Sequence, residues 1–287
     1  MKLLVLTSET PGNVWLVNQI LARFDVVGMV NVVGMVIERR PLALTRGEKY
    51  RRRRRMTQRH GVARTLNKLL YNWVRARFRL DSPVAARDHF FPSGAPVAYV
   101  REVPSITVEG INDAKCAEFI KRCAPDLLAV CGTGVIRPEV FSLAPKGALN
   151  IHTGITPEYR SADPIFWALY RGEPDKVGVT IHFIDRGIDT GPIIHQNAVP
   201  VYAEDSLGSI YARCMRRGAE LYLRALSEVE NGSTNTIERE GAENRAYRSI
   251  DLGIVQYILF RLRFRQMAKY LPHRDPRPAR QPGEADC

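Results

Sequence analysis

The first part of the chain changes its hydrophobic period from strand to helix and back to strand. Residues 2–7 form a short apolar run, residues 13–23 repeat apolar positions at helical spacing, and a second strand pattern begins at Asp25. Elements that alternate in this order are typical of a mostly parallel α/β sheet. Sheets of this kind bind their ligands at the carboxyl ends of the strands.

The α/β pattern resumes after residue 110 and continues to about residue 230. We expect a helix at 112–123, a strand at 126–131, a short helix at 138–142, strands at 177–184 and 192–201, and a helix at 206–229. Asp205 and Ser206 are suitable N-terminal caps for the last helix. The pattern predicts one α/β domain over 1–230. A C-terminal extension over 231–287 follows, and we expect its Pro/Arg-rich end to be disordered.

A tandem repeat lies in the second predicted strand. The hexapeptide VVGMVN at 26–31 is followed directly by VVGMVI at 32–37. Because six is an even number, the duplication preserves the two-residue period of a strand and extends it without exchanging its faces.

A basic segment at 39–80 interrupts the α/β pattern. It holds fifteen Lys/Arg residues and one acidic residue, Glu48, which gives it a charge of +14 against +12 for the whole chain. The part from 61 to 80 has helical spacing, with Val62, Leu66, Leu69, Leu70 and Trp73 on one side and Arg64, Lys68, Arg75 and Arg79 on another. The simplest interpretation is a helix whose apolar side packs and whose charges are solvated. The alternative is a segment that binds anionic lipid or nucleic acid.

Composition limits the remaining classes. A chain of 287 residues that is 45% hydrophobic can bury one substantial core, which excludes a disordered protein. No apolar run reaches the roughly 18 residues that a membrane span requires, and the opening residues do not resemble a secretion signal. We therefore expect a cytoplasmic protein, peripheral to the inner face of the membrane if the basic segment binds lipid. The five cysteines form no C-x-x-C pair, so neither a disulfide framework nor a metal site is expected.

Three polar residues carry the candidate chemistry. Asn150 and His152 are two residues apart at the end of a predicted strand, so their side chains project from the same face. Asp189 lies in a glycine-bounded loop between two predicted strands, where a carboxylate can approach the imidazole. An amide, an imidazole and a carboxylate together suit acyl transfer to an amine. Each residue also has a structural alternative, because Asn and Asp often form turns and a single His is often structural.

The spacing of these residues resembles a known family. The sequence L-N-I-H at 149–152, a proline five residues past the histidine, Y-R at 159–160 and I-D-T-G at 188–191 look like the formyltransferases that use 10-formyltetrahydrofolate. The resemblance covers about 120–230 closely. It implies a Rossmann-like, mostly parallel sheet, to which the basic helical segment and the short C-terminal extension are additions.

The resemblance also implies roles for particular residues. Asn150 would donate a hydrogen bond to the formyl oxygen, His152 would stabilise the developing oxyanion, and Asp189 would assist proton transfer and orient His152. The folate would lie against two loops, which comprise Cys131, Gly132, Gly134, Val135 and Ile136 and then Ile184, Asp185 and Gly187. Tyr159 and Arg160 would contact the acceptor. Ser161 departs from the glycine that many members carry, and the segment 39–80 has no counterpart in the family pattern.

The acceptor amine is less constrained. The family includes enzymes that act on methionyl-tRNA, glycinamide ribonucleotide, hydroxyornithine and nucleotide-linked amino sugars. The transfer-RNA enzymes resemble this core with an added C-terminal β-barrel, whereas the residues after Glu230 show little strand pattern. The run at 164–170 looks more like the amino-sugar N-formyltransferases, so a nucleotide-linked amino sugar is the expected acceptor. Methionyl-tRNA or another amine is the alternative, and an inactive nucleic-acid or membrane-binding relative is the alternative of another class.

Overall fold

The computed structural model describes residues 1–33, 46–78, 86–237 and 243–274. A seven-stranded sheet has the order β3-β2-β1-β4-β5-β7-β8. Its strands are β1 (Lys2–Thr7), β2 (Asp25–Val32), β3 (Ser105–Val108), β4 (Leu127–Cys131), β5 (Ala148–His152), β7 (Gly178–Phe183) and β8 (Ile193–Ala198). The first five strands in spatial order pair in parallel. The strand β7 runs antiparallel to β5, and β8 runs antiparallel to β7. The predicted Rossmann-like, mostly parallel sheet is confirmed.

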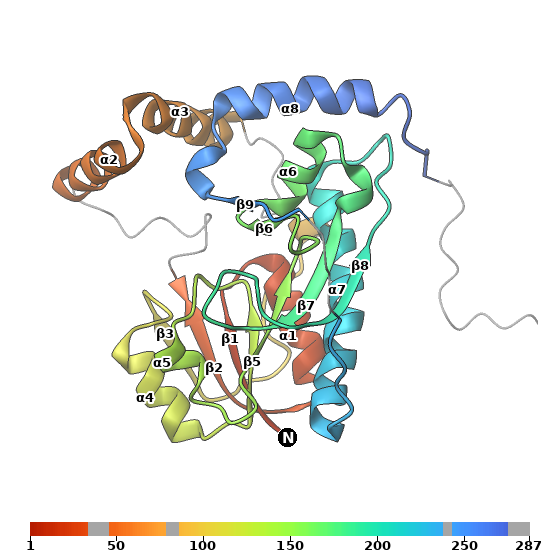
Figure 1. The fold of residues 1–287 in the computed structure, drawn as a ribbon. Helices are drawn as coiled ribbons and strands as arrows, with labels where there is room; N and C mark the ends of the chain where they lie inside the picture. Colours follow the sequence, from red (N-terminus) through yellow and green to blue (C-terminus); the bar gives the residue numbers. More distant parts are fainter. Residues whose placement is uncertain (34–45, 79–85, 238–242, 275–287) are drawn as a thin grey trace, which may run out of the picture.

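Helices cover both faces of this sheet (Figure 1). The helices α1 (Pro11–Leu21) and α7 (Leu207–Asn231) pack on one face, and α4 (Ala114–Cys123) and α5 (Pro138–Phe141) pack on the other. Successive strand residues point to opposite faces, so Leu3 and Val5 join the core with α1 and α7 while Leu4 and Leu6 join the core with α4. The two apolar layers account for the continuous apolar character of the central strands.

The C-terminal extension contains a helix that the sequence pattern does not reveal. The helix α8 (Ile254–Met267) packs against α6 (Pro164–Arg171), with the rings of Phe260 and Phe166 centred 5.0 Å apart. A two-stranded sheet joins β6 (Arg160–Ser161) to β9 (Ala246–Tyr247). Short 3₁₀ helices lie at Arg87–His89, Pro174–Lys176 and Ser249–Asp251. The extension therefore packs into one hydrophobic cluster with Tyr159 and with α6.

The basic segment forms the helices α2 (Arg46–His60) and α3 (Val62–Phe78). The helix at 61–80 is as predicted over 62–78, but the expected packing is wrong. Tyr71 is buried against Tyr257 of α8, whereas the apolar residues Val62, Leu66, Leu70 and Trp73 are exposed. The reason is that α3 docks through Thr65, Tyr71 and polar contacts rather than through its aliphatic side.

The hexapeptide repeat, the membrane span and the metal site can be compared with the described residues only. The strand β2 ends at Val32, and the second hexapeptide lies outside the described residues from position 34 onward, as does the end of the chain from 275. Among the described helices, none combines the length and the apolar character needed to cross a lipid bilayer. Across the described residues, no three His, Cys, Asp or Glu side chains gather as a metal-binding group.

Candidate functional site

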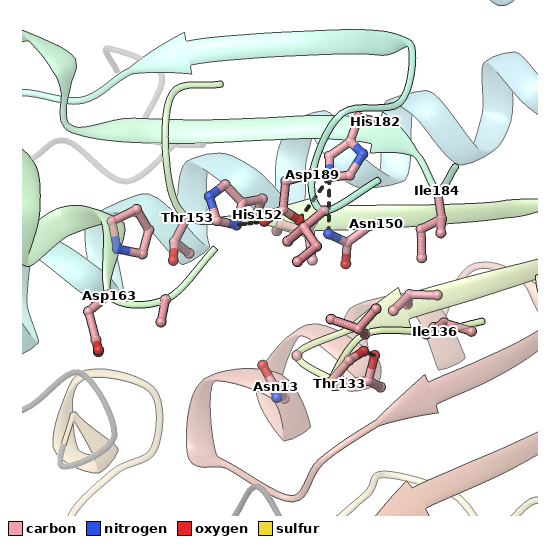
Figure 2. A pocket seen from close by; sticks show the side chains of 18 of the residues that line it. Asn13, Thr133, Ile136, Asn150, His152, Thr153, Asp163, His182, Ile184 and Asp189 are labelled. Carbon is pink, nitrogen blue, oxygen red and sulfur yellow. Dashed lines mark hydrogen bonds and ion pairs between the residues drawn. The ribbon is translucent and has the colours of Figure 1, made fainter. Parts of the chain in front are cut away.

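The candidate site lies at the carboxyl end of β5. Asn150 and His152 both belong to this strand and point to the same side, as their spacing predicts (Figure 2). The neighbouring strand β7 runs antiparallel to β5, and its register places His182 opposite Asn150 and Thr180 opposite His152. One sheet face therefore presents an amide and two imidazoles side by side.

His152 is buried and has a different partner at each ring nitrogen. Its Nε2 lies 2.9 Å from the backbone oxygen of Tyr159, and its Nδ1 lies 3.6 Å from Oδ2 of Asp189. Since a carbonyl oxygen only accepts, Nε2 carries the hydrogen of this bond. Burial lowers the pKa of His152 below its usual value, and the negative charge of Asp189 opposes this effect only in part.

The loop between β7 and β8 brings Asp189 to this imidazole. Asp189 has a left-handed backbone with φ of 51°, a conformation that Asp adopts more readily than most residues. Gly191 is required because a Cβ there would lie 1.9 Å from the backbone oxygen of Phe183. Oδ1 of Asp185 closes the loop by accepting from the backbone N–H of Gly187 and the hydroxyl of Thr190. Asp185 thus shapes the loop that carries Asp189.

His182 is a further residue of the site. Its Nδ1 lies 2.8 Å from the oxygen of Phe183, so Nδ1 carries the hydrogen and Nε2 is left as an acceptor. The amide Nδ2 of Asn150 lies 3.1 Å from that Nε2, and Oδ1 of Asp189 lies 3.5 Å from it. The alternation of T-I-H-F places Thr180 and His182 on one face, but only the pairing register brings that face beside Asn150.

A cavity of about 410 Å³ opens over these side chains. The three residues that carry the candidate chemistry, Asn150, His152 and Asp189, line it. So do seven of the eight residues expected to hold the folate: Gly132, Gly134, Val135, Ile136, Ile184, Asp185 and Gly187. Cys131 does not line it, because its side chain is fully buried in the core beneath the sheet. Asn13 lines the opposite wall, where its Nδ2 donates to Ser8 (Figure 2). No sequence signal marked Asn13.

Tyr159 and Arg160 do not line this cavity, and the acceptor contacts expected of them stay a prediction. The Tyr159 side chain is fully buried, and its hydroxyl donates to Oε2 of Glu173 at 2.6 Å. The guanidinium of Arg160 donates to the backbone oxygen of Ile188 at 2.7 Å and to the side chain of Asn244. Both side chains therefore make hydrogen bonds within the protein, and that of Arg160 holds the loop that carries Asp189.

Fold and site together define the class of protein: a Rossmann-like α/β domain with an amide, imidazole and carboxylate cluster at the carboxyl edge of its sheet. Residues 87–226 match the sequence profile of the formyl transferase family. The matched segment is just under half of the chain, and it resembles the enzymes of this family, which transfer formyl groups.

The curated relatives that the chain resembles include methionyl-tRNA formyltransferases. The chain is 38% identical over 130 residues to a methionyl-tRNA formyltransferase from Syntrophus aciditrophicus, a match that covers 45% of this chain and 41% of the relative. The chain spans about half the length of the curated relatives that it matches.

Solved structures share the fold at low sequence identity. A sugar N-formyltransferase from a Shewanella species superposes with a TM-score of 0.52 at 16% identity over 92% of this chain and 87% of that one. A glycinamide ribonucleotide transformylase from Symbiobacterium toebii gives 0.52 at 19% identity over 85% and 93%. These likenesses establish the fold.

Proposed function

We propose that the protein transfers a formyl group from 10-formyltetrahydrofolate to a primary amine. The observation that carries the proposal is the convergence of Asn150, His152 and Asp189 on one wall of a single cavity. Groups that polarise a carbonyl and accept a proton must lie within reach of the same reacting carbon. These three side chains meet that requirement, although they come from a strand and from a loop almost forty residues away.

The residues around the cavity suit a folate. Its volume of about 410 Å³ lies within the range of small-molecule sites. Val135 is 58% exposed and Ile188 is 44% exposed, so apolar side chains stand open at the site to cover a flat ring. The loops at 132–136 and 184–187 bring backbone donors and acceptors to the rim, where the polar edge of a pteridine needs them. When bound, the co-substrate supplies the activated formyl group.

Asn150 is the residue that would polarise the formyl oxygen. One hydrogen of its Nδ2 is directed to Nε2 of His182, which fixes the orientation of the amide. The second hydrogen then remains for the oxygen that gains negative charge as the amine attacks. A preoriented donor of this kind stabilises the transition state without reorganisation during the reaction.

His152 and Asp189 would handle the proton of the attacking amine. The neutral imidazole keeps its hydrogen on Nε2, so the lone pair of Nδ1 faces Asp189 across 3.6 Å. A proton that arrives between these two acceptors converts an unfavourable contact into a charge-assisted hydrogen bond. The pair is thereby suited to accept the proton of the amine and to return it to the leaving nitrogen of the folate.

For the acceptor, we propose the amino group of a nucleotide-linked amino sugar. Support comes from the run P-I-F-W-A-L-Y at 164–170, and from residues 243–274, which contribute α8 and a single strand of two residues. The second candidate is methionyl-tRNA, which the 38% identity to a methionyl-tRNA formyltransferase favours. A turnover screen with 10-formyltetrahydrofolate against amino-sugar nucleotides, methionyl-tRNA and glycinamide ribonucleotide separates these acceptors.

Site variants test the reaction itself. We expect Asn150→Ala and Asp189→Asn each to reduce kcat/KM for the accepted amine by about 10²–10⁴-fold, because each removes a group that acts on the transition state. The matched control is Asp88→Asn, whose carboxylate is exposed and does not line the cavity. Near-normal turnover of either site variant, or no formylation of any amine by the wild type, would contradict the proposal.

A further inference from the structure

The helix α3 is docked with its polar side inward. Arg64 lies 3.7 Å from Asp251, and Tyr71 is buried against Tyr257 of α8. Asn67 donates from Nδ2 to Gln256 at 2.8 Å, and its Oδ1 accepts from the backbone N–H of Val255 at 3.0 Å. The contacts that attach α3 to the body of the protein are therefore largely polar and aromatic.

The opposite side of α3 is apolar and uncovered by the described residues. Val62, Leu66, Leu70 and Trp73 recur at helical spacing, and their exposed fractions are 61%, 60%, 48% and 60%. Isolated exposed apolar side chains are common, but a row of four along one helix is a contiguous patch that marks an interaction surface. We call this row the outer face of α3.

The neighbouring helix α8 has a similar face. Val255, Ile258, Leu259 and Leu262 are exposed on the side away from Tyr257 and Phe260, which are buried. Figure 1 shows α2, α3 and α8 together at one end of the molecule, beyond the edge of the main sheet. Two helices that contact each other thus both expose aliphatic residues at this end.

Exposed positive charge lies on the helices at this end of the molecule. Arg51, Arg53, Arg54 and Arg55 of α2 are exposed, as are Arg261 and Arg265 of α8. Neither α3 nor α8 contains an aspartate or a glutamate. A partner for this end of the molecule must therefore accept aliphatic side chains and carry negative charge.

We propose that this end of the molecule, with the outer face of α3 at its centre, binds the surface of an anionic lipid bilayer. Aliphatic residues enter the acyl boundary while the arginines pair with lipid phosphates, which is the binding mode of interfacial amphipathic helices. A second copy of the chain would bring two arginine-rich helices together, and like charges oppose that contact. Nucleic acid offers no apolar layer for Val62, Leu66 and Leu70.

Vesicle binding tests the proposal without use of the enzymatic activity. The full chain is mixed with vesicles of phosphatidylcholine alone or of phosphatidylcholine with phosphatidylglycerol, and co-sedimentation is measured at low and high salt. We expect binding to the phosphatidylglycerol vesicles only, weakened by salt. The emission of exposed Trp73 should shift to shorter wavelength in the bound state, and Trp73→Phe should remove the shift while binding persists.

Two variants distinguish the apolar and the charged contributions. Leu66→Ser/Leu70→Ser/Trp73→Ser should abolish binding, with Asn72→Ser on the same helix as the matched control. Arg53→Gln/Arg54→Gln/Arg55→Gln should weaken binding by about a hundredfold, from about fivefold for each arginine near an anionic surface. All of the substituted side chains are exposed, so circular dichroism should be unchanged.

Three results would overturn the proposal. The first is absence of wild-type binding to phosphatidylglycerol vesicles at low salt. The second is equal binding by the Leu66/Leu70/Trp73 variant, which would show attraction by charge alone. The third is a concentration-dependent dimer in sedimentation velocity that the same variant dissociates, which would assign the face to a second copy.

Discussion

His152 has two ring nitrogens in different surroundings, and this asymmetry determines its protonation. The carbonyl of Tyr159 accepts from Nε2, while Nδ1 faces the carboxylate of Asp189. Burial disfavours the charged imidazolium, so the neutral form is present near pH 7 and is available as a proton acceptor.

The pKa of His152 can be measured directly. We expect its imidazole to titrate below 6.5, the ordinary value, in a pH series of NMR spectra assigned with His152→Gln. Asp189→Asn should lower this pKa further, because it removes the negative charge that favours the protonated ring. A value above 6.5, or a rise in Asp189→Asn, would show that burial is not the dominant cause.

The lowered pKa also predicts how stability depends on pH. The unfolded chain takes up a proton at His152 near pH 6.5, whereas the folded protein takes it up only at lower pH. The unfolded state therefore binds more protons in this window, and the free energy of unfolding should fall as the pH drops below about 6.5. Urea denaturation of His152→Gln should show a weaker pH dependence over the same window.

His182 is expected to act through Asn150. In His182→Ala the amide of Asn150 loses its acceptor, so we expect kcat to fall by about tenfold or more with little change in KM. His182→Gln can place an oxygen near the same position, and it should restore part of the lost kcat. Equal losses in the two variants, or a loss confined to KM, would argue for a packing role alone.

At the scale of elements, the loop between β7 and β8 fixes the position of Asp189. A backbone hydrogen bond from Phe183 to Pro192, at 3.0 Å, closes its base. Arg160 holds its outer side through Ile188, and Asp185 closes it internally. The loop is therefore constrained at three points, which suits a carboxylate that must hold a fixed distance from an imidazole.

Gly191 tests this constraint. We expect Gly191→Ala to lower both the melting temperature and the turnover, because its Cβ would lie 1.9 Å from a backbone oxygen and the loop base must shift. The matched control is Gly134→Ala, where no heavy atom lies within 4 Å of the added carbon and the melting temperature should stay the same. Equal melting temperatures for the two variants would contradict a rigid loop base.

At the scale of the whole molecule, a partly buried network connects the C-terminal extension to the α/β domain. Glu173 accepts from the hydroxyl of Tyr159 at 2.6 Å and from Nη1 of Arg245 at 2.9 Å. Partial burial by itself would raise the pKa of Glu173, but these hydrogen bonds outweigh it and lower the pKa to about 2. The extension thus contributes an ion pair as well as the apolar contacts of α8.

The pH dependence of this network gives a further prediction. Because the pKa of Glu173 falls from 4.5 in the unfolded chain to about 2 in the folded protein, its contribution to stability is complete above pH 4.5. It is lost as the pH falls from 4.5 toward 2. Glu173→Gln should lower the melting temperature at pH 7 and flatten the acid dependence. Glu220→Gln, at an exposed carboxylate, should do neither.

The sequence alone determined the features that depend on local spacing. Alternating and helical periods located most strands and helices of the α/β domain, and the two-residue spacing of Asn150 and His152 placed them on one face. The position of Asp189 between two glycines predicted a tight loop near them. These features follow from the backbone geometry of a few consecutive residues.

Tertiary structure decided the features that depend on pairing between distant segments. Strand register brought His182 to Asn150, and chain packing buried Tyr159 and used Arg160 to hold a loop. Polar contacts with α8 turned the aliphatic side of α3 outward, against the expectation from its helical wheel. A periodic pattern identifies the sides of an element, but which side becomes buried depends on the free energy of contacts with partners elsewhere in the chain.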